Sequence, residues 1–160
     1  MTRIKLLLVI GTRPEAIKMA PVVKECLRRS SDIAATICFT GQHCELLYQA
    51  ADYFGICSDV NLDAMCHGQT LAGLTARCVE GLSVLMQNNY DYVIAQGDTT
   101  TTLAASMAAF YHRIPFVHVE AGLRTDSVQS PWPEEFNRRA VSIATHLHCC
   151  PTQQAITNLL

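Results

Sequence analysis

Residues 91–120 read DYVIAQGDTTTTLAASMAAFYHRIPFVHVE and contain two apolar segments on either side of a helical stretch. The segment at 92–95 is short, apolar and followed by a Gly-Asp turn, which is typical of a buried parallel strand. Residues 100–112 then predict a helix, and residues 115–119 predict a second strand. A strand, a helix and a strand joined by short turns form a unit with parallel strands. This stretch therefore predicts an α/β fold.

The same alternation of strand and helix continues on both sides of this unit. Further strands are expected at residues 4–10, 34–39, 60–62 and 146–150. Further helices are expected at residues 14–29, 45–54, 70–87, 134–144 and 152–160. Alternating elements with short connections predict a Rossmann-like, doubly wound parallel sheet. No internal boundary is visible, so residues 1–160 are expected to form a single domain.

The composition favours a globular protein and excludes several classes of partner. Of the 160 residues, 49% are apolar, which is enough to cover a buried sheet with helices on both faces. A net charge of −2 would not attract nucleic acid or an anionic membrane, so neither is expected as a partner. The apolar opening at 4–10 is too short for a membrane span or a secretory signal, so we expect a cytoplasmic protein.

The eight cysteines are scattered along the chain without paired spacing. In the cytoplasm they would remain thiols, and we expect most of them to be small buried side chains rather than disulfide partners. The sequence HLHCC at 146–150 is the one cluster of metal-ligand types. A strand would split neighbouring ligands between its two faces, so no metal is predicted.

The turn after the first predicted strand reads GTRPE and lacks the GxGxxG pattern of dinucleotide-binding proteins. A nicotinamide cofactor is therefore not expected, and no other cofactor is predicted. Arg13 in this turn could instead pair with a diphosphate, helped by the free N–H groups at the start of the next helix. The structural alternative is a surface arginine that caps its neighbours.

Three carboxylates follow a predicted strand or begin a predicted helix. Asp98 and Glu120 each come after a strand, at the carboxyl edge where open α/β sheets bind ligands. Glu134 follows the proline-rich turn at 131–133, and by sequence reasoning alone Glu135 is its equal rival for a catalytic role. Carboxylates in one pocket suit acid and base chemistry, because burial and repulsion can separate their pKa values.

Each carboxylate also has a structural explanation. Asp98 could cap the helix that follows it. Glu120 could pair with Arg124, four residues later, and Glu134 could complement the positive end of its helix dipole. His118 shares a strand face with Glu120, and we expect it to be a core histidine bonded to the backbone.

Five motifs together resemble a known family. They are GTRPEAIK at 11–18, TGQH at 40–43, GDTTTT at 97–102, HVEAGLRT at 118–125, and SPWPEE followed by Asn137-Arg138 at 130–138. In this order they resemble the non-hydrolysing UDP-N-acetylglucosamine 2-epimerases of bacteria, and in particular the enterobacterial enzymes. The resemblance runs from about residue 4 to the last residue.

The resemblance implies a site and a reaction. By position, the catalytic acids of the family fall on Asp98, Glu120 and Glu134, while Arg13 and Lys18 match groups that face the nucleotide sugar. The implied reaction interconverts UDP-N-acetylglucosamine and UDP-N-acetylmannosamine, used for envelope polysaccharides, by eliminating UDP and adding it back.

The resemblance also implies an architecture. The family has two Rossmann-like domains in a GT-B-type fold, and residues 1–160 resemble the N-terminal half, with the domain incomplete at its C-terminal end and the UDP-binding domain absent. We therefore expect negligible turnover without a complementary C-terminal domain, and the family suggests a homodimer. The alternatives are a noncatalytic remnant or interaction module, or a hydrolysing 2-epimerase that releases UDP and free N-acetylmannosamine.

Overall fold

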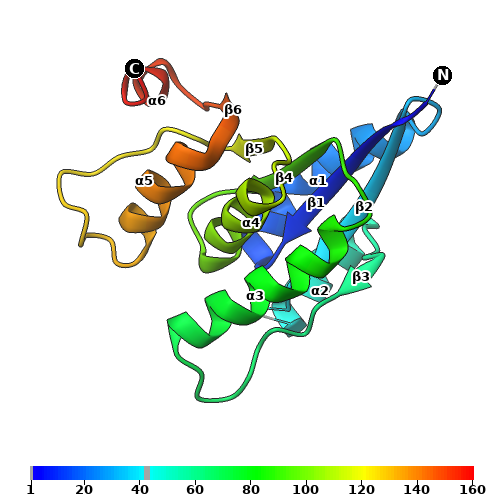
Figure 1. Ribbon diagram of the computed structural model, residues 1–160, viewed down its shortest axis with the longest axis horizontal. Coiled ribbons are helices and arrows are strands. Elements are labelled where there is room, and N and C mark those ends of the chain that lie inside the picture. The colour runs from blue at the N-terminus through cyan, green and yellow to red at the C-terminus, as the bar shows by residue number, and fades with distance from the viewer. Residues whose placement is uncertain (1, 42–43) are drawn as a thin grey trace.

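The computed structural model describes residues 2–41 and 44–160, which form one sheet with helices on both faces (Figure 1). The strands are β1 (Ile4–Ile10), β2 (Ile33–Phe39), β3 (Val60–Asn61), β4 (Tyr92–Gln96), β5 (Phe116–Val119) and β6 (Thr145–Cys149). The helices are α1 (Arg13–Arg28), α2 (Cys44–Phe54), α3 (Leu71–Met86), α4 (Thr100–Tyr111), α5 (Glu134–Ala144) and α6 (Gln153–Thr157). All strands are parallel, in the order β3-β2-β1-β4-β5-β6. The predicted doubly wound sheet is confirmed.

The strand order places a switch point between β1 and β4. From β1 the chain runs outward to β2 and β3, then returns to β4 on the other side of β1 and continues to β5 and β6. Leu8 of β1 is in register with Ile37 of β2 and with Ile94 of β4. The turns after β1 and β4 therefore leave the same edge of the sheet toward opposite faces, which is where such folds bind ligands.

Alternating side chains of β1 supply both halves of the core. Leu6, Leu8 and Ile10 pack with α1 and α2 on one face of the sheet. Leu7 and Val9 pack with α3, α4 and α5 on the other face. The two-residue period of a strand thus explains why the apolar run at the start of the chain is buried from both sides.

The boundaries of three elements differ from the sequence-based expectation. β3 has only two residues, β6 begins directly after α5, and α6 ends at Thr157. These elements lie at the two edges of the sheet or beyond it, where fewer neighbouring elements constrain their ends. Within the described residues, no helix has both the length and the apolar character needed to cross a bilayer.

The described cysteines are free thiols, but fewer of them are buried than expected. Burial raises the pKa of Cys38 to about 12 and that of Cys78 to about 11, which makes both thiols unreactive. Cys26 is also buried, whereas the exposed cysteines are Cys57, Cys66 and Cys149. The expectation that most cysteines are buried was therefore wrong, because these three lie in connecting segments or on the edge strand β6.

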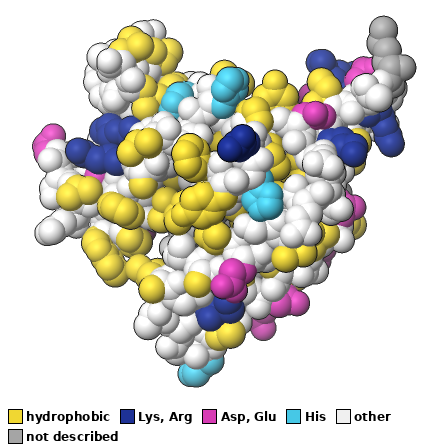
Figure 2. Space-filling view, viewed as in Figure 1, with side chains coloured by type: hydrophobic (Ala, Val, Ile, Leu, Met, Phe, Trp, Pro, Cys, Tyr) yellow, Lys and Arg dark blue, Asp and Glu magenta, His cyan; other side chains and the backbone are white. Residues whose placement is uncertain are grey.

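Apolar side chains also remain exposed on one side of the molecule, where Figure 2 shows them gathered over the helices of that side. On α4, Phe110 and Tyr111 are 65% and 64% exposed. On α5, Phe136 and Ile143 are 53% and 88% exposed. Gathered apolar side chains of this kind are typical of a surface that contacts another protein.

Candidate functional site

Four segments meet at the carboxyl edge of the sheet and carry its polar side chains. They are the turns after β1, β4 and β5 and the start of α5. Gly97 in the β4 turn has a φ of +87°, and Glu120 in the β5 turn has a φ of +65°. Glycine adopts this left-handed conformation easily, but glutamate does so only with strain, which is concentrated at functional sites. Asp63, Asn89 and Arg113 share this conformation, so positive φ alone does not distinguish the β5 turn.

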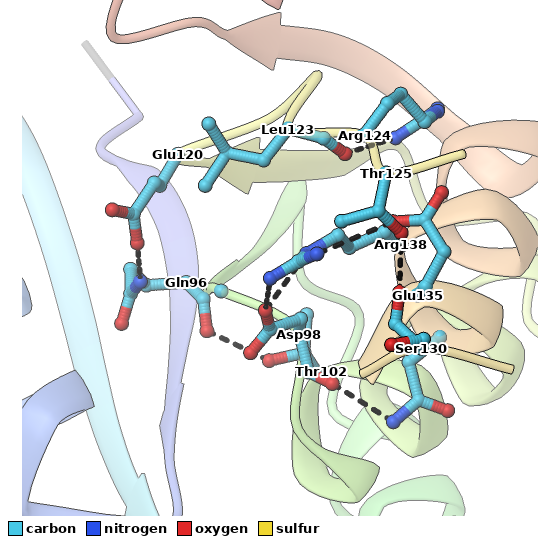
Figure 3. Close-up of polar contacts among 12 residues, drawn as sticks. Gln96, Asp98, Thr102, Glu120, Leu123, Arg124, Thr125, Ser130, Glu135 and Arg138 are labelled. Atoms are coloured by element: carbon cyan, nitrogen blue, oxygen red, sulfur yellow. Dashed lines mark hydrogen bonds and ion pairs between the residues drawn. The ribbon is translucent and has the colours of Figure 1, made fainter. Parts of the chain in front are cut away.

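Asp98 is held by two consecutive residues of α5 (Figure 3). Arg138 lies against the Asp98 carboxylate, with Nη2 2.6 Å and Nε 2.8 Å from Oδ2. The Asn137 side-chain amide donates a 2.8 Å hydrogen bond to the Asp98 backbone carbonyl. The cap of α4 is instead Thr99, whose hydroxyl accepts the Thr102 N–H at 3.3 Å. The capping explanation for Asp98 is therefore excluded.

Glu120 is held by a lysine from α1 and a glutamine from β4. Lys18 Nζ donates to both carboxylate oxygens, at 2.8 Å to Oε1 and 2.6 Å to Oε2. Gln96 Nε2 donates to Oε2, and Figure 3 shows the two side chains facing each other. The Arg124 guanidinium donates to a backbone carbonyl and to the Ser142 hydroxyl, so its suggested pair with Glu120 is not made.

The neighbouring acids Glu134 and Glu135 lie in different environments. Glu135 is fully buried and pairs with Arg138 Nη1 at 3.2 Å and with Arg139 Nε at 2.8 Å. Burial raises the pKa of Glu135, but the hydrogen bonds from Arg139 and Arg138 outweigh it and hold the pKa below its usual range. Glu134 is half-buried, and none of the residues in 2–41 and 44–160 bonds to its carboxylate. Glu134 is therefore the acid that remains open to a ligand.

Arg13 and Lys18 lie on the same helix but point to different surroundings. Lys18 reaches the Glu120 carboxylate. Arg13 is exposed and lines a pocket of about 410 Å³ together with Ile17 of α1 and Tyr53 of α2. Within the described part of the chain, no hydrogen bond or ion pair engages the Arg13 guanidinium. The structure thus joins Lys18 to Glu120, whereas among the described residues the Arg13 guanidinium bonds to no side chain.

His118 supports the turn that carries Asp98. Its side chain is 2% exposed, and Nε2–H donates a 2.7 Å hydrogen bond to the Gly97 carbonyl. Burial lowers the pKa of His118 despite this bond, which leaves the ring neutral near pH 7. The expectation of a core histidine bonded to the backbone is confirmed.

Several supporting residues were not identified as such from the sequence. Gln96, Asn137 and Arg138 contact the predicted acids directly, and the buried Glu15 accepts a hydrogen bond from Thr99, the residue after Asp98. For Arg138, the sequence did contain one indication: Glu135 lies three residues before it, a spacing that allows an ion pair on one helix face. The second half of the TGQH motif, residues 42–43, lies outside the described residues.

The arrangement suits proton transfer to a ligand that carries negative charge. Asp98 and Glu120 place two carboxylates at the sheet edge, and Glu134 adds a third that bonds to none of the residues the structure describes. Lys18 and Arg13 supply positive charge from α1. Among the described residues, no group of three or more His, Cys, Asp or Glu side chains is placed to hold a metal ion.

Comparisons with known proteins point to one family. The family model for UDP-N-acetylglucosamine 2-epimerase matches residues 25–160. The protein of that name from Yersinia pestis is 50% identical over 157 residues, which cover 98% of this chain and 42% of that protein. The protein of that name from Neisseria meningitidis serogroup A is 47% identical over 157 residues, with the same coverage of 98% and 42%.

Solved structures agree with these matches. The crystal structure of UDP-GlcNAc 2-epimerase from Neisseria meningitidis, bound to UDP-GlcNAc, has a TM-score of 0.93 at 46% identity and covers 98% of this chain and 42% of that one. The expected likeness to the N-terminal half of a GT-B-type fold is confirmed by such matches. The chain thus spans 42% of the length of the curated relatives it matches.

Proposed function

The chain belongs to the UDP-N-acetylglucosamine 2-epimerase family, and from this premise we propose that it provides the acid-bearing wall of a nucleotide-sugar site. The proposed reaction interconverts UDP-N-acetylglucosamine and UDP-N-acetylmannosamine, which differ in configuration at C2 of the sugar. One observation carries the proposal: Asp98 and Glu120, each beside a cationic side chain, lie in the turns that follow the adjacent strands β4 and β5. This edge lies next to the switch point, where α/β sheets bind ligands.

We assign the proton transfers at C2 to Asp98, Glu120 and Glu134. A carboxylate takes the C2 proton while the bond between C1 and the phosphate oxygen breaks, and UDP leaves with the electron pair. A carboxylic acid then returns a proton to the opposite face of C2 as UDP adds back to C1. The cycle requires one acid and one base, which is why more than one carboxyl must reach the sugar.

The two cations of α1 have complementary parts in this reaction. UDP carries the charge that develops as the C1–O bond breaks, so a fixed positive charge near the diphosphate stabilises the departing group. Arg13 is free to take that position, whereas Lys18 is paired with Glu120. Phosphate oxygens would compete with Glu120 for Lys18, and the exchange would release the Glu120 carboxylate from its cation, with Gln96 still bonded to it.

The proposal extends to the partners of this chain. The matched segment covers 42% of the length of the relatives. We propose that a second domain, as the family resemblance implies, binds UDP and closes the opposite side of the site. Without that wall the acids face water, which weakens their electrostatic contacts and admits solvent to the eliminated intermediate. We therefore propose negligible turnover by the 160-residue chain alone. From the family resemblance we also propose a homodimeric assembly and a cytoplasmic role in envelope polysaccharide synthesis.

The test is an epimerisation assay on the chain alone and after addition of the C-terminal domain of the Yersinia pestis relative. NMR resolves UDP-GlcNAc, UDP-ManNAc, free N-acetylmannosamine and UDP. We expect UDP-ManNAc to form in the mixture and not with either part alone. A folded mixture that forms no product would instead favour a noncatalytic interaction module. Release of free N-acetylmannosamine with UDP would identify a hydrolysing epimerase.

A further inference from the structure

Glu15 is a buried carboxyl that the proposed proton transfers do not use. It is 2% exposed, although it lies in the first turn of α1. Oε2 accepts the backbone N–H groups of Gly11 and Thr12, the latter at 3.0 Å. Oε1 accepts the Thr99 hydroxyl at 2.6 Å, from 84 residues away. A capping glutamate needs only the Thr12 contact, so the bond to Thr99 requires a separate explanation.

Thr99 links this carboxyl to the turn that carries Asp98. Thr99 follows Asp98 directly, and its oxygen accepts the Thr102 N–H as the cap of α4. A hydroxyl has one proton, and here that proton goes to Glu15 while the oxygen serves α4. Glu15 therefore bonds to the turns after β1 and after β4, the two turns that leave the switch point.

Gly11, in the turn after β1, packs directly against the first turn of α4 and against the residue that follows β2. A Cβ added to Gly11 would lie 2.1 Å from Thr101 Oγ1 and 2.6 Å from Thr40 Oγ1. Those two hydroxyls are themselves hydrogen-bonded at 2.9 Å. Glycine is required because any side chain would push the turn after β1 away from the start of α4, which directly follows the Asp98 turn.

The burial of Glu15 is costly for the fold. It raises the pKa of Glu15 to about 7, even though hydrogen bonds from Thr99, Gly11 and Thr12 lower it. A glutamate at the surface would cap α1 without this desolvation. Arrangements that oppose stability in this way are expected where a site needs its parts held in place.

We propose that Glu15 is a positioning residue. It holds the turn after β1, which leads into Arg13, and the turn after β4, which carries Asp98, at the separation a nucleotide sugar requires. The inference rests on the proposed function. Arg13 would meet the diphosphate while Asp98 meets the sugar, so the separation of the turns decides whether both contacts form at once. A misplacement of about 1 Å can cost roughly 100-fold in rate.

The first test is an NMR titration of the chain, which needs no catalytic activity. Thr99→Val keeps the shape of the side chain but removes the proton donated to Glu15. Because that hydrogen bond lowers the pKa of Glu15, its loss should raise the pKa and shift the backbone amide signals of residues 11–13. Cys78 of α3 also interacts with Glu15, but with a pKa of about 11 it stays uncharged in this range.

Thr70→Val is the matched control. Thr70 caps α3 by accepting the Gly73 N–H at 3.1 Å, as Thr99 caps α4, but it makes no bond to Glu15. It should leave the Glu15 titration and the signals of residues 11–13 unchanged. If Thr99→Val also leaves both unchanged, Glu15 does not couple the two turns and the proposal is overturned.

The second test uses the mixture of this chain with the C-terminal domain. Thr99→Val should lower kcat roughly 10- to 100-fold with a smaller change in KM, Thr99→Ser should recover most of that loss, and Thr70→Val should have little effect. Full kcat in Thr99→Val, or an equal loss in Thr70→Val, would contradict a positioning role. A mixture without activity would count against the proposed function, while the NMR titration would still decide whether Glu15 couples the turns.

Discussion

Asp98 and Glu120 end neighbouring strands, yet their cationic partners are anchored in different ways. Arg138 is only 16% exposed and also binds the fully buried Glu135. Lys18 is 49% exposed, and in the described part of the chain its ammonium bonds to Glu120 alone. The Asp98 pair is thus built into the packing of α5, whereas the Glu120 pair can exchange with water or a ligand.

The difference suits a reaction in which a charged group leaves and returns. Asp98 keeps a fixed position because both its carboxylate and its backbone carbonyl are bonded to α5. Lys18 can move between Glu120 and a phosphate without disturbing the core, because its side chain lies at the surface. One side of the site would therefore be rigid and the other adjustable.

Replacing Arg138 should give the largest effect. Arg138→Met removes a partner from both Asp98 and the buried Glu135, so we expect a loss of about 4 kcal/mol in the free energy of unfolding. Urea denaturation followed by circular dichroism measures it. Arg139→Met is the control, since Arg139 also binds Glu135 but is 46% exposed, and it should cost about 1 kcal/mol. Equal losses of unfolding free energy in Arg138→Met and Arg139→Met would show that the buried position of Arg138 does not make its ion pairs stronger than a surface pair.

The pH dependence of stability should reveal a third kind of carboxyl, Glu15, which bonds to no cation in residues 2–41 and 44–160. Its pKa is raised from 4.5 to about 7, so the folded state binds the proton more tightly than the unfolded state. The contribution of protonated Glu15 to the free energy of unfolding is therefore fully present below pH 4.5. It is lost as the pH rises through 7, and the free energy of unfolding falls by on the order of 3 kcal/mol.

Urea denaturation at pH 4.5 and pH 7.5 tests this contribution. Glu15→Gln should lose less stability between the two values than the unsubstituted chain. Glu45→Gln is the matched control, because Glu45 also lies in the first turn of a helix but is exposed. If Glu15→Gln and Glu45→Gln show the same pH dependence, Glu15 is not a strained buried acid.

Replacing Lys18 should have the smallest effect on folding. Lys18→Met removes a surface ion pair, so the free energy of unfolding should change by less than about 1 kcal/mol. In the mixture with the C-terminal domain, affinity for UDP-GlcNAc should fall roughly tenfold, because one phosphate contact is lost. Calorimetry of UDP-GlcNAc binding measures this change. Destabilisation as large as that of Arg138→Met would show that the Lys18 pair is structural.

The fold could be predicted from the sequence because the signals that determine it are local. The apolar run of β1, the Gly-Asp turn after β4 and the glutamate after β5 each identify a strand end from a few adjacent residues. Parallel strands bring their carboxyl ends to one edge, so the placement of Asp98 and Glu120 at the same edge followed from the predicted topology.

The partners of those acids could not be predicted, because they are distant in sequence and lie on other elements. Lys18 is 102 residues from Glu120, and Arg138 is 40 residues from Asp98. The burial of Glu135 also contradicts local periodicity. Counting back one and two helical turns from the buried Val141 reaches residues 137 and 134, so the pattern points to Glu134 rather than Glu135 as the inward acid.

Deuterium incorporation at C2 of the sugar tests the central claim most directly. The mixture of chain and C-terminal domain is incubated with UDP-GlcNAc in D2O, and Asp98→Asn, Glu120→Gln and Glu134→Gln are compared with Glu135→Gln by NMR. We predict that the unsubstituted mixture exchanges the C2 proton and that each of the first three variants loses exchange by 100-fold or more, as expected for a proton-transfer group. Glu135→Gln should keep exchange in whatever fraction remains folded. Undiminished exchange in any of the first three variants would exclude that residue from proton transfer, and undiminished exchange in all three would contradict the account.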